Sequence, residues 1–248
     1  MVVRRGAMPM SGAAVLAATE LLVDGGVIDL DDDERHHLQV RRVSDGATVR
    51  VFDGEGGTAA GVLRHAKSSA TVTISNVHRA DRPAPTVLAI GAGDKDRFIA
   101  LAERATELGV TELIPVEAER ARDVAGRVRA AHLDRMRRRA REACKQCGNP
   151  WATTIVEPLS FEQLIQRYRA RRWLVADHSG GAAPGIGTVE AIGWIIGPEG
   201  GLTPDEMVRC RETLGAVSVT LGPSILRFDT AAIVAAGLTI DRRLTAER

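Results

Sequence analysis

The sequence predicts an α/β protein with a mainly parallel sheet and helices on both faces, preceded by a small β-rich domain. From Thr86 onward, short apolar stretches alternate with amphipathic helical patterns, which is typical of parallel sheets. Residues 17–78 instead indicate short strands and turns. Two prolines in residues 80–85 favour an extended linker. We therefore predict domains at 1–80 and 83–248.

Composition indicates a soluble globular protein. Of 248 residues, 44% are hydrophobic and 26% are charged. No apolar stretch approaches the ~18 residues of a membrane helix. Residues 1–10 lack the apolar core and cleavage site of a secretory signal, and we expect them to be disordered. Three cysteines, an odd number, favour thiols in a reducing cytoplasm.

The first domain contains a histidine pair and two arginines. We expect an acidic turn at 31–33, and Asp53-Gly54 has the composition of a hairpin turn. Adjacent His36 and His37 do not indicate a metal site, because sequence neighbours point apart in regular structure and no third ligand is evident. Arg41 and Arg42 are interpreted as RNA contacts, with solvated surface as the alternative. Strands are expected at 27–30, 49–52, 61–63 and 70–74.

The second domain has the alternating pattern of a doubly covered sheet. We expect strands at 86–90, 112–116, 153–156, 173–176, 193–196 and 216–220. We expect helices at 96–108, 130–147 and 231–238, and a further helix that begins at Pro204.

A glycine-rich turn follows the strand at 193–196. Its residues are Gly197, Pro198, Glu199, Gly200 and Gly201, and their small size lets backbone groups approach a ligand closely. Thr203, Pro204 and Glu206 then have the spacing of an N-cap, a first-turn proline and a capping box. The turn therefore joins the carboxyl end of a strand to a helix, where α/β sheets bind ligands. An ordinary glycine-containing loop is the alternative.

A second turn, at residues 221–230, follows the strand at 216–220 and leads into an apolar helix. The two strand–turn–helix units are close in sequence, so both turns are expected to line one pocket. The second turn reads Leu221-Gly222-Pro223-Ser224-Ile225-Leu226-Arg227-Phe228-Asp229-Thr230. Together the two turns resemble those of the RsmE family of bacterial 16S ribosomal RNA methyltransferases, in the SPOUT superfamily.

Two further segments are similar to this family. His36 to Val43 is similar to its H-H-L-x-x-V-x-R pattern, and Lys95 to Val110 to its K-A-T-E-L-G-V pattern, with Arg104 replacing a lysine. The resemblance implies a C-terminal trefoil knot, a PUA-like RNA-binding β-barrel at the N-terminus and a homodimer. It also implies S-adenosylmethionine as methyl donor and N3 of a uridine in the 16S RNA of the small ribosomal subunit as acceptor.

The resemblance assigns site residues in both turns. Arg227 is the candidate for stabilising a uracil anion, and Asp229 for acting as base or orienting group. The alternative is that Arg227 only braces the fold by pairing with Asp229 or Glu199. The residues expected to bind the cofactor are Ile196, Gly197, Pro198, Glu199, Gly200, Gly201, Leu221, Gly222, Ile225 and Leu226.

A basic stretch runs from Arg120 to Lys145. It contains ten arginine or lysine residues against Asp123, Asp134 and Glu142, and such a local surplus favours phosphate binding over a merely solvated helix face. The residues predicted to contact RNA across the chain are Arg41, Arg42, Lys95, Arg135, Arg138 and Lys145.

Two other clusters are interpreted without a catalytic role. Cys144 and Cys147 have the spacing of half a metal site, but no second pair completes it, so we expect no metal. Asp177, His178 and Ser179 are consecutive and cannot adopt the geometry of a hydrolase triad.

Three positions depart from the family pattern. Asn149 and Ser224 stand where the family has arginine, and Asp229 stands where it has glutamate. Two alternatives to uridine methylation therefore stay open. One is a knotted RNA methyltransferase with another target, such as a ribose 2′-hydroxyl or another base. The other is a non-catalytic RNA-binding factor in ribosome assembly.

Overall fold

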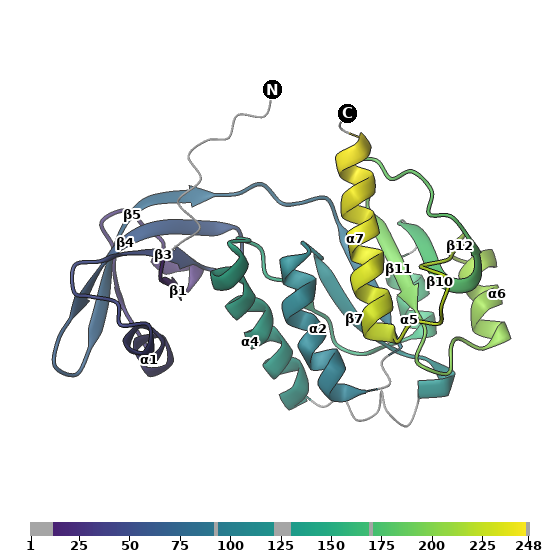
Figure 1. The fold of residues 1–248 in the computed structure, drawn as a ribbon, viewed down its shortest axis with the longest axis horizontal. Helices are drawn as coiled ribbons and strands as arrows, with labels where there is room; N and C mark the ends of the chain where they lie inside the picture. The colour runs from purple at the N-terminus through teal and green to yellow at the C-terminus, as the bar shows by residue number, and fades with distance from the viewer. Residues whose placement is uncertain (1–11, 92–93, 122–129, 169–170, 247–248) are drawn as a thin grey trace. The chain divides into compact units, whose positions relative to one another are not determined.

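The computed structural model describes residues 12–91, 94–121, 130–168 and 171–246 (Figure 1). The expected disorder of residues 1–10 lies outside these ranges, and so do Arg122, Arg127 and Arg129 of the basic stretch. The chain divides into two compact units. One unit contains Met1–Arg82 together with Arg141–Ala152, and the other contains Pro83–Ala140 and Thr153–Arg248. The return of residues 141–152 to the first unit was not expected from the sequence.

The first unit contains a five-stranded sheet in the order β1-β3-β4-β5-β2. All four predicted strands are present, and β1 is an additional edge strand that pairs with β3 in parallel. Alternate residues of β3 and β5, among them Val49, Val51, Val72 and Ile74, face a common apolar core. The elements are β1 (Ala14–Leu16), η1 (Thr19–Leu21), β2 (Val27–Asp29), α1 (Asp32–Val40), β3 (Thr48–Phe52), β4 (Gly57–His65) and β5 (Ala70–Arg79).

Helix α1 replaces the acidic turn that we expected at 31–33. The Asp31 side chain accepts a hydrogen bond from the N–H of Glu34 at 2.8 Å and caps the helix. Asp32, Asp33 and Glu34 then occupy the first turn, where negative charge is favourable because of the helix dipole. The predicted turn was wrong because the acidic residues were interpreted as a turn, whereas Asp31 acts as the N-cap of a helix.

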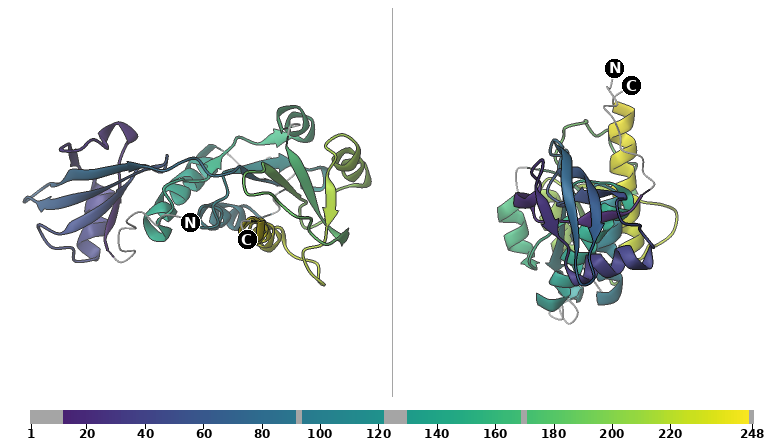
Figure 2. Two further views of the ribbon diagram at one scale, coloured as in Figure 1. Left: turned by 90° about the horizontal axis from the view of Figure 1, so that it is seen from above. Right: turned by 90° about the vertical axis from the view of Figure 1, so that its left-hand side faces the viewer.

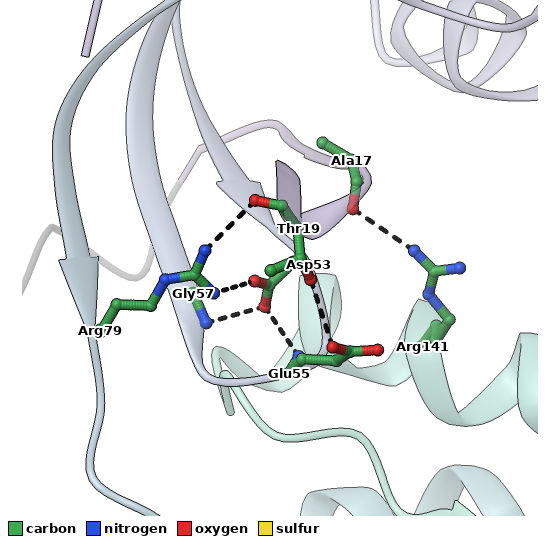
Figure 3. Close-up of polar contacts among 7 residues, drawn as sticks. All are labelled: Ala17, Thr19, Asp53, Glu55, Gly57, Arg79 and Arg141. Carbon is green, nitrogen blue, oxygen red and sulfur yellow. Dashed lines mark hydrogen bonds and ion pairs between the residues drawn. The ribbon is translucent and has the colours of Figure 1, made fainter. Parts of the chain in front are cut away.

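A buried carboxylate organises the turn between β3 and β4 (Figure 3). Asp53 Oδ1 accepts hydrogen bonds from the N–H groups of Glu55 and Gly57, both at 2.7 Å. Its Oδ2 accepts from the Arg79 guanidinium at 2.5 Å, and Arg79 also donates to the Thr19 carbonyl at 3.2 Å. The Asp53 side chain is fully buried, so these contacts supply the hydrogen bonds that water would otherwise give it.

Residues 141–152 join the first unit through an internal ion pair. Lys145 Nζ lies 2.7 Å from Glu34 Oε1 and 2.7 Å from Glu142 Oε2, and the Lys145 side chain is only 6% exposed. The Lys145 carbonyl accepts from Arg50 at 3.2 Å, and the N–H of Ala152 donates to the Gly54 carbonyl. Burial raises the pKa of Glu34, against the opposing effect of Lys145.

The second unit contains a seven-stranded sheet in the order β12-β10-β11-β6-β7-β8, with β9 paired to β7. All of its strand pairs are parallel. The strands are β6 (Thr86–Ile90), β7 (Glu112–Glu117), β8 (Thr154–Ile155), β9 (Leu159–Ser160), β10 (Arg172–Gly181), β11 (Ile192–Ile196) and β12 (Val217–Val219). The helical elements are α2 (Lys95–Glu107), η2 (Glu119–Ala121), α4 (Ala130–Cys147), α5 (Phe161–Tyr168), α6 (Pro204–Glu212) and α7 (Phe228–Ala246).

Helices cover both faces of this sheet (Figures 1 and 2). Leu88 and Ile90 of β6 point to the face packed by α2, α4 and α7, whereas Val87 and Ala89 point to the face packed by α5 and α6. The buried indole of Trp194 lies on the first of these faces, and that of Trp173 lies on the second. The alternation along each strand therefore confirms the doubly covered parallel sheet. Helix α7 is longer than predicted, and α5 and β9 were not predicted.

Replacing Asp53 by alanine is expected to destabilise the first unit by roughly 2–4 kcal/mol, because two backbone N–H groups and Arg79 lose their buried acceptor. Urea denaturation of the full chain measures this change. Asp45→Ala is the matched control, because Asp45 pairs with Arg64 and accepts the His65 N–H at an exposed site, where water can replace the lost contacts and the cost should be far smaller. Equal effects of the two substitutions would contradict the role given to Asp53.

Candidate active site

A pocket of about 450 Å³ lies at the carboxyl ends of β10, β11 and β12. Its size falls in the range of small-molecule sites. The two turns form much of its wall, and all ten residues predicted to bind a cofactor line it. The expectation that both turns line one pocket is therefore confirmed.

In the first turn, backbone atoms pack closely against one another. The N–H of Gly201 donates to the Pro198 carbonyl at 2.8 Å, and Gly201 has a φ of 71°, which favours glycine. A Cβ on Gly197 would lie 2.9 Å from the backbone nitrogen of Leu202. Arg120 Nη1 donates to the Gly200 carbonyl at 2.5 Å and braces the turn.

The helix after this turn begins with the predicted capping box. Thr203 Oγ1 accepts from the N–H of Glu206, and Glu206 Oε2 accepts from the N–H of Thr203 at 2.8 Å. The second oxygen of the buried Glu206 carboxylate accepts from the N–H of Glu119 at 2.8 Å. One side chain therefore ties the start of α6 to the segment that follows β7.

The second turn contributes apolar side chains to the wall of the pocket. Leu221 and Leu226 are partly buried and pack against the core, whereas Ile225 is 85% exposed. Thr220 Oγ1 donates to the Gly222 carbonyl at 3.1 Å and holds the start of the turn. The pocket therefore combines backbone polar groups with apolar side chains that suit a flat heterocyclic ring.

Sequence reasoning missed a charged end of the pocket. Asp177 and Arg211 line it, joined by an ion pair of 3.0 Å between Oδ2 and Nη2. Burial opposes ionisation of Asp177, but hydrogen bonds from the Ser179 N–H and hydroxyl and the charge of Arg211 prevail, so its pKa is lowered. The helical spacing of Met207 and Arg211, four residues apart, was the available signal that both face one side of α6.

The two predicted catalytic residues lie where α7 begins. Arg227 is exposed, and Asp229 lies in the first turn of the helix. Asp229 Oδ2 is 3.5 Å from Arg97 Nη1, while its Oδ1 is buried and has no hydrogen-bond partner among the residues that the structure describes. Within the described residues no ion pair joins Arg227 to Asp229 or Glu199, so the structure gives no support to the alternative in which Arg227 serves as a brace.

The predicted RNA-contacting residues divide into two groups. Arg41, Arg42, Lys95, Arg135 and Arg138 are exposed. The prediction for Lys145 is corrected, because its ammonium group is buried between two carboxylates and is not presented to solvent.

Part of the basic surplus of α4 is neutralised within the protein. Arg137 lies 2.9 Å from Asp134 and 2.6 Å from Glu157, and Arg139 lies 3.9 Å from Glu103. The exposed cations of α4 are therefore fewer than the sequence count implied.

Two of the three cysteines, Cys144 and Cys210, are buried. Burial raises the pKa of the Cys144 and Cys210 thiols to about 12. Within the described residues, no three His, Cys, Asp or Glu side chains cluster in a way that could hold a metal ion. Among the described helices, none has the length and hydrophobicity that a bilayer crossing requires.

Comparison with known proteins identifies the family. A family model described as an RNA methyltransferase domain matches residues 80–240, and one described as an RNA methyltransferase PUA domain matches residues 30–75. Ribosomal RNA small subunit methyltransferase E of Mycobacterium bovis is 31% identical over 240 residues, which cover 90% of each chain. The chain belongs to the ribosomal RNA small subunit methyltransferase E family.

Solved structures of this kind share the fold. The crystal structure of ribosomal RNA small subunit methyltransferase E from Neisseria gonorrhoeae bound to S-adenosyl methionine is 27% identical, with a TM-score of 0.82, and covers 93% of this chain and 98% of that one. A probable rRNA-methyltransferase from Porphyromonas gingivalis is 26% identical, with a TM-score of 0.78, and covers 94% and 99%. The SPOUT-type α/β fold with a PUA-like N-terminal domain is thus confirmed.

Gly197→Ala is expected to lower the free energy of unfolding by about 1–3 kcal/mol, because its Cβ would press on the backbone of Leu202 and Gly201. Gly200→Ala is the control within the same turn. Its Cβ would meet only the Arg120 side chain, at 3.4 Å, and its effect should stay below about 1 kcal/mol. Thermal unfolding of both variants measures the difference, and a more destabilising Gly200→Ala would contradict this account of the turn.

Proposed function

We propose that this protein transfers a methyl group from S-adenosylmethionine to N3 of a uridine in the 16S RNA of the small ribosomal subunit. The observation that carries the proposal is the pocket shared by the two turns, in a chain whose relatives bear the name ribosomal RNA small subunit methyltransferase E. The relative from Neisseria gonorrhoeae was crystallised with S-adenosyl methionine.

The pocket fits this cofactor in size and chemistry. Gly197, Gly200 and Gly201 present backbone groups without a Cβ, which suits recognition of an adenine edge. Leu221 and Leu226 offer apolar surface for the faces of the ring. When bound, S-adenosylmethionine supplies an electrophilic methyl group and needs no metal. The protein therefore has to orient the reactants and exclude water.

The residues at the start of α7 suit the acceptor side of the reaction. N3 of uracil carries a proton that must leave before or during attack. Asp229 Oδ1, which has no hydrogen-bond partner in the described part of the chain, is the proposed acceptor for that proton, and Arg97 lies 3.5 Å from the other carboxylate oxygen. The exposed Arg227 guanidinium is placed to stabilise negative charge on the uracil ring.

Exposed arginines suit contact with RNA phosphates. Arg41 and Arg42 belong to the first unit, and Lys95, Arg135 and Arg138 to the second. Each phosphate that they neutralise would release counterions and make binding salt-dependent. With ribosomal RNA as substrate, we infer that the protein acts in the cytoplasm. We also propose that it forms a homodimer.

Wild-type protein is expected to bind S-adenosylmethionine saturably in a calorimetric titration, and Gly200→Val to abolish binding. A Cβ at Gly200 would make only an ordinary contact of 3.4 Å with the Arg120 side chain, so the backbone of the turn need not move, and the added bulk is expected to hinder the close approach of a ligand. Thermal unfolding of the variant is the control. Absence of binding by the wild type, with and without small-subunit RNA, would favour the RNA-binding assembly factor.

Mass-spectrometric mapping of the methylated nucleotide distinguishes uridine-N3 methylation from methylation of another target by a related knotted methyltransferase. A 3-methyluridine that appears in small-subunit RNA only with active protein supports the proposal. Methylation of a ribose 2′-hydroxyl or of another base would contradict the uridine-N3 assignment.

Asp229→Asn and Arg227→Ala are each expected to lower the methylation rate about a hundredfold or more, because proton removal or anion stabilisation is lost. Their affinity for S-adenosylmethionine, measured by calorimetry, should stay within about threefold, since neither residue lines the cofactor pocket. Asp241→Asn, an exposed aspartate in the same helix, is the matched control. An unchanged rate for both variants would remove these residues from the mechanism.

A further inference from the structure

The charged end of the pocket has no role in the mechanism derived so far. Asp177 and Arg211 line the same pocket as the first turn, although the sequence does not indicate a hydrolase triad of Asp177, His178 and Ser179. Their arrangement deepens the proposed function and rests on it, because it concerns how the methyl donor is held.

Asp177 is fixed before any ligand arrives. Its Oδ1 accepts from the N–H and hydroxyl of Ser179 at 3.0 and 2.9 Å, and its Oδ2 accepts from Arg211 at 3.0 Å. The side chain is 16% exposed, and Asp177 is one of the residues that line the pocket. A carboxylate held ionised at a partly desolvated site attracts a cation more strongly than one in bulk water.

Arg211 is fixed by the same set of contacts. Its Nε and Nη2 both donate to the Ser218 hydroxyl, at 3.3 and 3.2 Å, and Nη2 also donates to Asp177. In the described part of the chain, Nη1 has no acceptor within hydrogen-bond distance, and the side chain is 52% exposed. The guanidinium therefore keeps donor capacity for a carboxylate ligand.

The charges of the pocket lining match those of the proposed methyl donor. Asp177 and Glu199 contribute two carboxylates and Arg211 one guanidinium. S-adenosylmethionine carries two positive groups, the sulfonium and the α-ammonium, and one carboxylate. We propose that Asp177 and Arg211 hold the amino-acid end of the methyl donor, Asp177 receiving its α-ammonium and Arg211 its carboxylate.

A second ion pair on the same helix provides the structural comparison. Arg209 and Glu162 are 2.9 Å apart, both exposed, and neither lines this pocket. A pair that only supports α6 should behave like this one when a ligand is titrated. A pair that holds the ligand should affect binding according to which groups the ligand carries.

The test is calorimetric titration of wild type, Asp177→Asn, Arg211→Gln and the control Arg209→Gln with three ligands. S-adenosylmethionine carries both charged groups of the amino acid, decarboxylated S-adenosylmethionine keeps only the ammonium, and 5′-methylthioadenosine has neither. We expect Asp177→Asn to weaken the first two at least tenfold and 5′-methylthioadenosine less than twofold. We expect Arg211→Gln to weaken S-adenosylmethionine at least tenfold and the other two less than threefold, and Arg209→Gln to change none.

The remaining outcomes overturn either the amino-acid assignment alone or the proposed function together with it. Equal weakening of all three ligands by Asp177→Asn would mean that the carboxylate holds the ribose or only supports the pocket, and the amino-acid assignment would be wrong. Unchanged affinities in both variants would also overturn it. Absence of binding of every ligand by the wild type would overturn the proposed function itself, and this assignment with it. Thermal unfolding of each variant shows whether a loss reflects unfolding.

Discussion

The close backbone packing at the end of β11 is the constraint on which the pocket depends. Gly197 leaves no space for a Cβ against Leu202, and a Cβ on the neighbouring Gly91 would lie 2.8 Å from the Pro198 ring. Strand ends, turn and helix start therefore meet without side chains between them. The buried Glu206 carboxylate completes the arrangement, because it satisfies N–H groups of both Thr203 and Glu119. Polar groups that are buried in this way must be paired, which makes the geometry of the turn specific.

Much of the fold could be predicted because its signals are local. The strand at 86–90 and the helix at 130–147 have the predicted bounds, and the capping box of Thr203 and Glu206 is present as its spacing indicated. Helix α7 begins at Phe228 rather than Ala231, because Phe228 packs on Phe98 and draws the first turn into the core. That contact joins residues 130 positions apart, and no local pattern records it.

The parts of the candidate site that are formed by backbone groups could be predicted from the sequence. The parts formed by side chains from distant segments were harder to predict. Glycine-rich turns can be recognised from composition, so the sequence predicted both turns and the pocket that they line. The pair of Asp177 and Arg211 was missed because Arg211 comes from a separate helix, 34 residues later. Lys145 was misjudged for a similar reason, since its carboxylate partner Glu34 lies 111 residues earlier. A charge count cannot distinguish a cation offered to solvent from one that is neutralised internally.

The assignment of Arg141–Ala152 to the first unit has a consequence for synthesis of the chain. The polypeptide leaves this unit after Arg82, builds part of the second, returns, and leaves again after Ala152. Neither unit is continuous, so the N-terminal segment emerges from the ribosome without the Lys145 that pairs with its buried Glu34. Domains that fold in order during translation do so when each is complete. Here the first unit is complete only after residue 152, so its maturation is tied to a segment that lies well inside the methyltransferase domain.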